Sequence, residues 1–237
     1  MALPKIGYPT FELELPSTGK TVKYRPFLVK EEKVLLLALE SEDEKQITSA
    51  VKDLIKNCVI SRIKVETLPS FDLEYLFLKI RAASIGEIIT LTVTCLDDNE
   101  TTVEANININ EVEVFRPEGH DRKIMFTEES GIIMNYPSMK QFVDREFLQK
   151  EMKTEEVYEF IADSIDQIFD GEDVYDSSTT SKKEFREFLD TLTTKQFEKV
   201  QQFYATAPKL RHQFMVVNPK TGKESNYTIE GLQSFFA

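Results

Sequence analysis

Hydrophobic and polar residues alternate with a period of two in four stretches of the chain, and this pattern predicts four β-hairpins. In the first stretch Phe11, Leu13 and Leu15 alternate with glutamates, and the sequence PSTGK supplies the turn. The other three hairpins are expected at 87–109, 122–137 and 210–229. The first and last turns each contain a Gly-Lys pair, in which the glycine supplies a positive φ.

Apolar residues repeat at helical spacing between and after these hairpins. Three helices are expected before the second hairpin, at 28–41, 45–60 and 69–86. The first of them, LVKEEKVLLLALES, has the helix formers that suit a buried helix. Five more helices are expected later, of which the last is a short closing helix, at 138–149, 154–168, 185–192, 194–204 and 230–237.

These elements predict an α+β fold class. Residues 1–136 are expected to form a mixed N-terminal domain of hairpins and three helices. Residues 137–237 are expected to form a mostly helical domain that ends in a β-hairpin and a short helix, with Pro137 at the boundary. The 237 residues include 41% hydrophobic residues and 17 Phe, which is enough to bury a core in one or two domains.

The stretch IFDGEDVYDSSTTSKKEF places four acids beside a glycine: Asp170, Glu172, Asp173 and Asp176. A calcium-binding loop needs oxygen ligands at positions 1, 3, 5 and 12 and glycine at position 6, and no frame through these acids meets that requirement. The favoured interpretation is a connector between two helices, in which Gly171 ends the first helix. A capping box formed by Ser181 and Glu184 starts the second. The acids then form a solvated, negatively charged loop that can face a partner.

The net charge of −12 argues against a nucleic-acid partner, which would need a basic face. The charge is also uneven along the chain. Residues 144–190 contain 15 acids and 6 Lys or Arg, whereas residues 195–224 contain 6 Lys or Arg and 2 acids. Two interpretations remain open: the two segments dock to other proteins, or they face each other.

The longest apolar run, Val34 to Leu39, is a third of the length that a membrane span requires, so no span is expected. The N-terminus lacks the apolar region of a secretory signal. Cys58 and Cys95 are the only cysteines, and two cysteines do not make a disulfide framework, so a reducing cytosol is expected. Cys58 falls on the apolar face of its helix and is predicted to be a core residue.

No catalytic, cofactor or metal site is predicted, and no small-molecule substrate. His120 and His212 have no neighbour at metal-ligand spacing, and neither Gly-Lys pair belongs to a phosphate-binding loop. Two alternatives are retained as tests. One is a hydrolase that uses the four acids, with or without His212. The other is a metal- or nucleic-acid-binding module on the Cys95 hairpin, where Asp98 occupies the second position of a C-x-x-C spacing.

Two long stretches, with the acidic IFDGEDVYD, resemble a known family. They are LELPSTGKTVKYRPFLVKEEKVLLLA (13–38) and the C-terminal segment that begins FLDTLTTKQF (188–236). They resemble the baseplate hub and hub-assembly protein family of T-even-like contractile-tailed bacteriophages. Many members of that family carry a C-x-x-C near the position of Cys95. This chain keeps one cysteine, which weakens a metal role without disturbing the fold.

The resemblance implies a non-enzymatic protein of tail morphogenesis whose partners are other phage baseplate hub or tail proteins. It implies a location in the host cytoplasm during assembly or in the tail baseplate of the virion. A subunit of the finished hub and an assembly chaperone that leaves it are both compatible with the resemblance.

If the protein acts by contact, exposed aromatic residues in loops are the candidate contact residues. They are Phe27, Tyr175, Phe235 and Phe236, together with the acids Asp170, Glu172, Asp173 and Asp176. The competing interpretation is that Phe235 and Phe236 close the C-terminal core and that Tyr175 folds back over the acidic loop.

Overall fold

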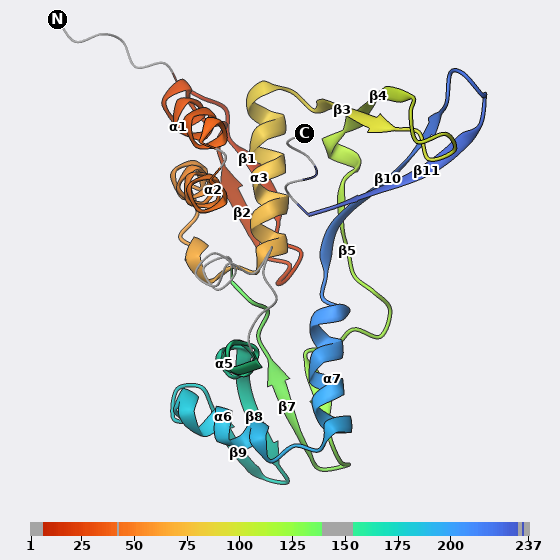
Figure 1. The fold of residues 1–237 in the computed structure, drawn as a ribbon. Coiled ribbons are helices and arrows are strands. Elements are labelled where there is room, and N and C mark those ends of the chain that lie inside the picture. The colour runs from red at the N-terminus through yellow and green to blue at the C-terminus, as the bar shows by residue number, and fades with distance from the viewer. Residues whose placement is uncertain (1–6, 42, 139–153, 232–233, 235–237) are drawn as a thin grey trace, which may run out of the picture. The chain divides into compact units, whose positions relative to one another are not determined.

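The computed structural model describes residues 7–41, 43–138, 154–231 and 234. These residues contain six helices and eleven strands, and the strands form four antiparallel sheets (Figure 1). The chain divides into two compact units. Unit 1 comprises residues 1–115 and 209–237, and unit 2 comprises residues 116–208.

Unit 1 contains three helices, three β-hairpins and one further strand. Its helices are α1 (Val29–Glu40), α2 (Glu44–Cys58) and α3 (Ser70–Ile85), with short 3-10 turns at Val65–Thr67 and Ile109–Glu111. Its strands are β1 (Phe11–Glu14), β2 (Thr21–Tyr24), β3 (Ile88–Thr94), β4 (Thr102–Asn108), β5 (Glu113–Phe115), β10 (Lys209–Val217) and β11 (Glu224–Glu230).

The predicted hairpins of unit 1 are confirmed. They are β1–β2, β3–β4 and β10–β11, and β5 adds to β10 to give a three-stranded sheet in the order β11-β10-β5. Gly19 and Gly222 in the first and last turns have φ of 68° and 71°, so the predicted reason for glycine at these positions holds.

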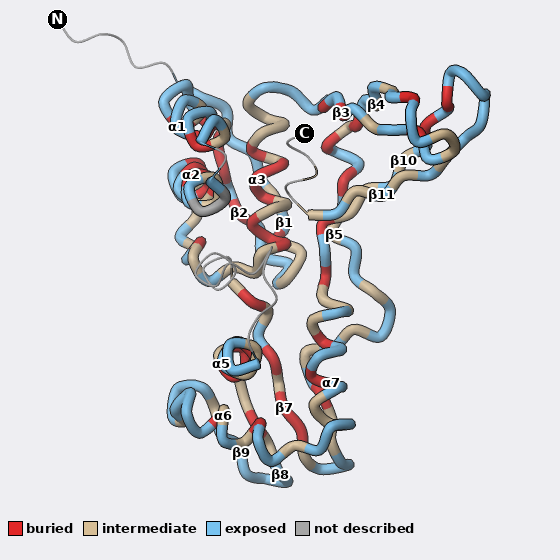
Figure 2. The backbone as a smooth tube through the Cα atoms, in the orientation of Figure 1, coloured by how far each residue is buried: buried red, intermediate tan, exposed pale blue. Residues whose placement is uncertain are grey.

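The α3 helix contributes several side chains to the core of unit 1, of which Leu73, Leu76 and Phe77 are almost fully buried. Figure 2 shows buried positions along this helix. Gly86, with φ of 112°, follows its last residue. Cys58 at the end of α2 is completely buried as a free thiol, as predicted. The surface features of unit 1 are therefore supported by a helix, α3, that is itself largely buried.

Unit 2 is a four-stranded sheet in the order β6-β7-β8-β9, packed with helices. Its strands are β6 (Lys123–Met125), β7 (Ser130–Met134), β8 (Ile165–Asp170) and β9 (Asp173–Asp176), and its helices are α5 (Thr154–Ser164), α6 (Lys182–Asp190) and α7 (Thr194–Ala205). Side chains of the sheet and of all three helices form one apolar core, which includes Ile132, Met134, Phe185, Val200 and Phe203.

The prediction of a mostly helical C-terminal region is wrong, because β8 to β11 all lie after residue 164. The helix expected at 154–168 ends at Ser164, and the following residues pair with β7, so that Ile168 lies opposite Ile132. Gly171, with φ of 59°, sits in the β8–β9 turn and does not end a helix. The segment that was predicted to connect two helices is therefore the β8–β9 hairpin, which α6 follows.

The helix starts in this region were predicted better. A capping box of Ser181 and Glu184 opens α6, as expected. Thr193 caps α7 in the same way, with Gln196 as its partner. The predicted helix at 138–149 lies almost wholly outside the described residues, and most of the closing helix at 230–237 does too.

The two units also divide the chain differently from the expected domains 1–136 and 137–237. Pro137 lies inside unit 2, whose β6 and β7 precede it and whose β8 and β9 follow it. The terminal hairpin β10–β11 belongs to unit 1.

Candidate protein-docking site

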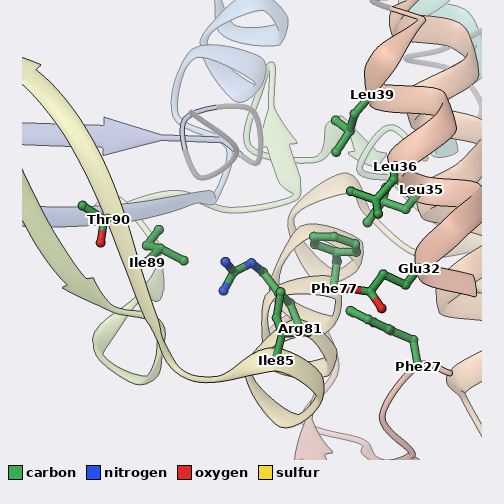
Figure 3. A pocket seen from close by; sticks show the side chains of 10 residues that line it. All are labelled: Phe27, Glu32, Leu35, Leu36, Leu39, Phe77, Arg81, Ile85, Ile89 and Thr90. Carbon is green, nitrogen blue, oxygen red and sulfur yellow. The ribbon is translucent and has the colours of Figure 1, made fainter. Parts of the chain in front are cut away.

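A pocket of about 220 Å³ opens on unit 1 between α1, the C-terminal half of α3 and the start of β3 (Figure 3). We call it the α1–α3 pocket. Its lining is mainly apolar, with two charged members and one threonine: Phe27, Glu32, Leu35, Leu36, Leu39, Phe77, Arg81, Ile85, Ile89 and Thr90. Phe77 and Leu35 are buried beneath it, whereas Leu36 and Ile85 are more than half exposed. The pocket is therefore an apolar hollow with an apolar rim that solvent reaches.

The α1 helix carries more apolar side chains than its packing buries. Glu31, Leu35 and Ala38 form its buried face. Because successive residues are about 100° apart on a helix, Leu36 lies on the flank next to the pocket and Val34 and Leu37 lie on the other flank. All three are more than half exposed, so the prediction that this helix is buried is wrong for these positions.

A buried ion pair holds the first turn of α1 in place. Nη2 of Arg25 lies 3.1 Å from Oε1 of Glu31, and Arg25 also donates to the carbonyl oxygens of Pro26 and Asn57. The other oxygen of Glu31 accepts the N–H of Leu28 at 2.6 Å. Burial alone would raise the pKa of Glu31, but the hydrogen bonds from Arg25 and Leu28 outweigh burial and lower it.

The two charged residues of the pocket stand apart. Glu32 projects from α1, while the guanidinium of Arg81 is directed toward Ile89 and Thr90 (Figure 3). Arg81 donates one long hydrogen bond of 3.4 Å to the carbonyl oxygen of Gly86. Within the described part of the chain no carboxylate forms an ion pair with it. Burial lowers the pKa of Arg81, which means that its charge is partly withdrawn from water.

The predicted acidic contact residues come together on one hairpin of unit 2, β8–β9. Asp170, Glu172 and Asp173 are exposed, and Tyr175 is about half exposed on the edge strand β9. The carboxylate of Asp176 stabilises its own loop. It accepts hydrogen bonds from the hydroxyl of Ser178 and from nearby backbone N–H groups. These bonds, that of the Ser178 hydroxyl above all, lower the pKa of Asp176.

The other predicted contact residues are placed differently. Phe27 is only 8% exposed, so the expectation of an exposed loop aromatic is wrong. Its ring lines the α1–α3 pocket, and its N–H donates to Oγ of Ser84 at 2.9 Å. Phe235 and Phe236 lie outside the described residues. The prediction missed the rim residues, although the uninterrupted run VLLLAL is a usable signal, since one helical face cannot bury all of it.

A family model with the description T4 bacteriophage base plate protein matches residues 8–237. The chain belongs to this family. The predicted resemblance is thus confirmed at the level of a T4-like phage baseplate protein. Membership supports phage tail proteins as partners and the tail baseplate of the virion as a location. No match was found among curated proteins, and none among solved structures.

The Cys95 hairpin of this baseplate protein is held by a polar network. Asp98 stands at the second position of the C-x-x-C spacing, and its carboxylate accepts bonds from both the N–H and the hydroxyl of Thr101. The buried Asn218 at the β10–β11 turn donates to the carboxylates of Asp97 and Asp98 at 2.8 Å and 3.1 Å. These bonds lower the pKa of Asp98 and join the tips of two hairpins of unit 1. Cys95 itself is buried, and burial raises the pKa of its thiol.

The histidines of the baseplate protein lie in different units. His120 is partly buried in unit 2, where its ring stacks on Tyr136 and Phe203, and His212 lies on β10 in unit 1. Over the residues that the structure describes, no three His, Cys, Asp or Glu side chains come close enough together to hold a metal ion. Nor does any helix in that part of the chain have the length and apolar content needed to cross a membrane.

Proposed function

We propose that this baseplate protein is a component of the baseplate hub and works through protein–protein contacts, without catalysis. The observation that supports the proposal is the apolar rim of the α1–α3 pocket on unit 1, where Leu36 and Ile85 are more than half exposed. Soluble monomers rarely leave such residues grouped in water. Covering one large aliphatic side chain contributes on the order of 1.5–3 kcal/mol, which a partner surface gains on binding.

The test combines copy number with complex formation. The protein is co-expressed with the other baseplate proteins of its phage and analysed by size exclusion, and purified virions are analysed by quantitative mass spectrometry. A hub component forms a complex and is present in virions in stoichiometric amounts. Complex formation with absence from virions would identify a transient assembly chaperone. Elution as a lone monomer in every combination would contradict both roles.

The uneven charge adds a kinetic expectation to the proposal. If the acidic hairpin of unit 2 steers the protein toward a basic partner surface, the association rate falls as ionic strength rises. Stopped-flow association at two salt concentrations measures this effect. Changing Asp170, Glu172 and Asp173 to amides should remove most of the salt dependence.

The non-enzymatic part of the proposal has its own test. The protein is screened for hydrolysis of cell-wall glycans beside a variant in which Asp170, Glu172, Asp173 and Asp176 are changed to Asn or Gln. Activity present in the parent protein and lost in the variant would contradict the proposal.

A further inference from the structure

We propose that the α1–α3 pocket binds an apolar segment of another baseplate protein and that a carboxylate of this segment pairs with Arg81. The inference rests on the proposed function, because it assumes that the protein works by contact. It names the part of the surface that makes the contact and the chemistry of the segment that is bound.

The size and lining of the pocket favour a protein segment as the occupant. Small-molecule sites measure roughly 300–1,000 Å³ and enclose most of their ligand. The volume of about 220 Å³ suits one or two large apolar side chains instead. Phe77 and Leu35 offer them an apolar floor, and the exposed Leu36 and Ile85 extend the contact beyond the hollow. The arrangement resembles that of a contact whose anchor residue fills a pocket within a wider apolar surface.

The charge of Arg81 specifies the polar part of the segment. A guanidinium that is partly withdrawn from water loses hydration. A carboxylate compensates for this loss by forming two parallel hydrogen bonds with the guanidinium. In the described structure its one hydrogen bond is the 3.4 Å contact with Gly86, so most of its donors remain available. Glu32 stands on the opposite, α1 side of the pocket (Figure 3). An acidic side chain or a C-terminal carboxylate beside the anchor residue would satisfy Arg81.

Net charge argues that the segment comes from a different protein. Each copy of this chain carries a net charge of −12, and such copies repel one another. Association of two copies of this chain through the pocket would have to overcome that repulsion. A partner with an apolar, locally acidic segment on an otherwise less acidic surface does not meet this barrier.

Site-specific photo-crosslinking tests the location of the contact. A photoreactive benzophenone amino acid replaces Leu36 or, as a matched control, Leu37, which lies on the other flank of α1 and is similarly exposed (52% and 56%). Ile85 and Ile88 give a second matched pair at 55% and 54%. The protein is irradiated in complex with its co-expressed baseplate partners, and the linked peptides are sequenced.

Positions 36 and 85 should link to one apolar peptide of a partner that contains Asp, Glu or a C-terminal carboxyl group, and positions 37 and 88 should link to it much less. Equal linking from all four positions would overturn the proposal. So would a linked peptide without an acidic group, or linking only to a second copy of this chain.

Charge substitution tests the role of Arg81. Arg81→Met keeps the apolar stem and removes the charge, and Arg81→Glu reverses it. Both should raise the Kd for the partner by about tenfold or more, with Arg81→Glu the stronger. The exposed Arg62 gives the control Arg62→Glu, which should leave the Kd within about twofold. Far-UV circular dichroism establishes that each variant is folded.

Failure of this proposal and failure of the proposed function give different results. If the parent protein binds no baseplate protein, the proposed function fails. If the parent protein binds and the folded Arg81→Glu and Leu36→Ser variants bind equally well, the pocket is not the contact site and the proposed function stands.

Discussion

Arg25 and Glu31 show how one buried pair directs the chain into α1. Their side chains are only 9% and 4% exposed, and both charges are satisfied by each other and by backbone groups. A buried ion pair is weak evidence of net stability, since two charges lose hydration when it forms. Removing one partner is strongly destabilising, because the remaining charge stays buried without a counter-charge. The pair therefore constrains the position of α1 and of the pocket wall that α1 provides.

The variant Glu31→Gln should lower the free energy of unfolding by roughly 3–5 kcal/mol, because it leaves the guanidinium of Arg25 buried without a counter-charge. Urea unfolding followed by far-UV circular dichroism measures the change, since the chain has no tryptophan to report by fluorescence. Lys30 also contacts Glu31, at 3.4 Å, but its side chain is largely exposed. Lys30→Gln should therefore cost less than about 1 kcal/mol. Similar losses in the two variants would contradict this account.

The neighbours of His120 determine the protonation state of its imidazole. Its Nδ1 lies 2.9 Å from Oγ1 of Thr206, whose hydroxyl donates to the carbonyl of Gln202. Its Nε2 lies 2.9 Å from the hydroxyl of Tyr136, and its ring stacks on Phe203. These partners fit a neutral imidazole that donates from Nδ1 and accepts at Nε2. Burial lowers the pKa of His120, helped by the charge of Arg116 and opposed by that of Asp121.

His120 should make the stability of the protein sensitive to acid. Because its pKa is lowered on folding, the unfolded chain, with a histidine pKa near 6.5, binds its proton first as pH falls. Stability is therefore lost progressively below about pH 6.5. Urea unfolding at about pH 7 and about pH 5 should show a smaller acid-induced loss in His120→Gln than in the parent protein. His212→Gln is the control, and an equal flattening there would refute the assignment to His120.

At the scale of the element, Gly131 is required where β7 passes between β6 and β8. A Cβ at this position would meet the carbonyl oxygen of Ile124 and lie 2.7 Å from Cζ of Phe169. The strand therefore has no room for a side chain, although its φ is not positive. The hairpin predicted at 122–137 is present as β6–β7, but the close approach that needs glycine also involves β8, far along the chain.

The variant Gly131→Ala should destabilise unit 2 by about 2 kcal/mol or more, since a backbone oxygen and a packed ring must both move. Urea unfolding measures the loss. Gly7→Ala is the matched control, because nothing lies within 4 Å of a Cβ at Gly7, and its effect should stay within about 0.5 kcal/mol. A neutral Gly131→Ala would mean that β7 and β8 pack less closely than described.

Structural features that depend on residues close together in the sequence were predicted correctly. The hairpin turns at Gly19 and Gly222 and the capping box at Ser181 depend on residues at most a few positions apart, and all three were correct. The end of α5 was missed because Ile165 and Ile168 fit the helical stripe equally well. Their strand conformation depends on pairing with β7, more than 30 residues earlier. The α1–α3 pocket was missed for the same reason, since it needs α1, α3 and β3 together.

At the scale of the whole molecule, unit 2 is inserted into unit 1. The chain leaves unit 1 after β5 and returns at β10, and Phe115 lies directly opposite Lys209 in the antiparallel pair. Residues opposite each other in such a pair have Cα atoms about 5 Å apart. The two ends of unit 2 are therefore joined to neighbouring points of one sheet, and the described residues that form its core all belong to unit 2.

This topology predicts that each unit folds without the other. A fragment of residues 116–208 should show helical and strand circular dichroism and a cooperative urea transition, because it keeps all four strands of its sheet and its apolar core. A fragment of residues 137–208 is the control. It begins at the boundary predicted from the sequence and lacks β6 and β7, so β8 loses its inner partner and the fragment should not unfold cooperatively.

The reciprocal variant replaces residues 116–208 with a linker of about four glycine and serine residues, which is long enough to join Phe115 to Lys209 as a hairpin loop. It should fold and, because it keeps the whole α1–α3 pocket, it should retain binding to any partner that uses this pocket. A cooperative 137–208 fragment together with an unfolded 116–208 fragment would show that the boundary lies at Pro137 after all. Failure of both the 116–208 fragment and the linked variant would show that neither unit is stable without the other.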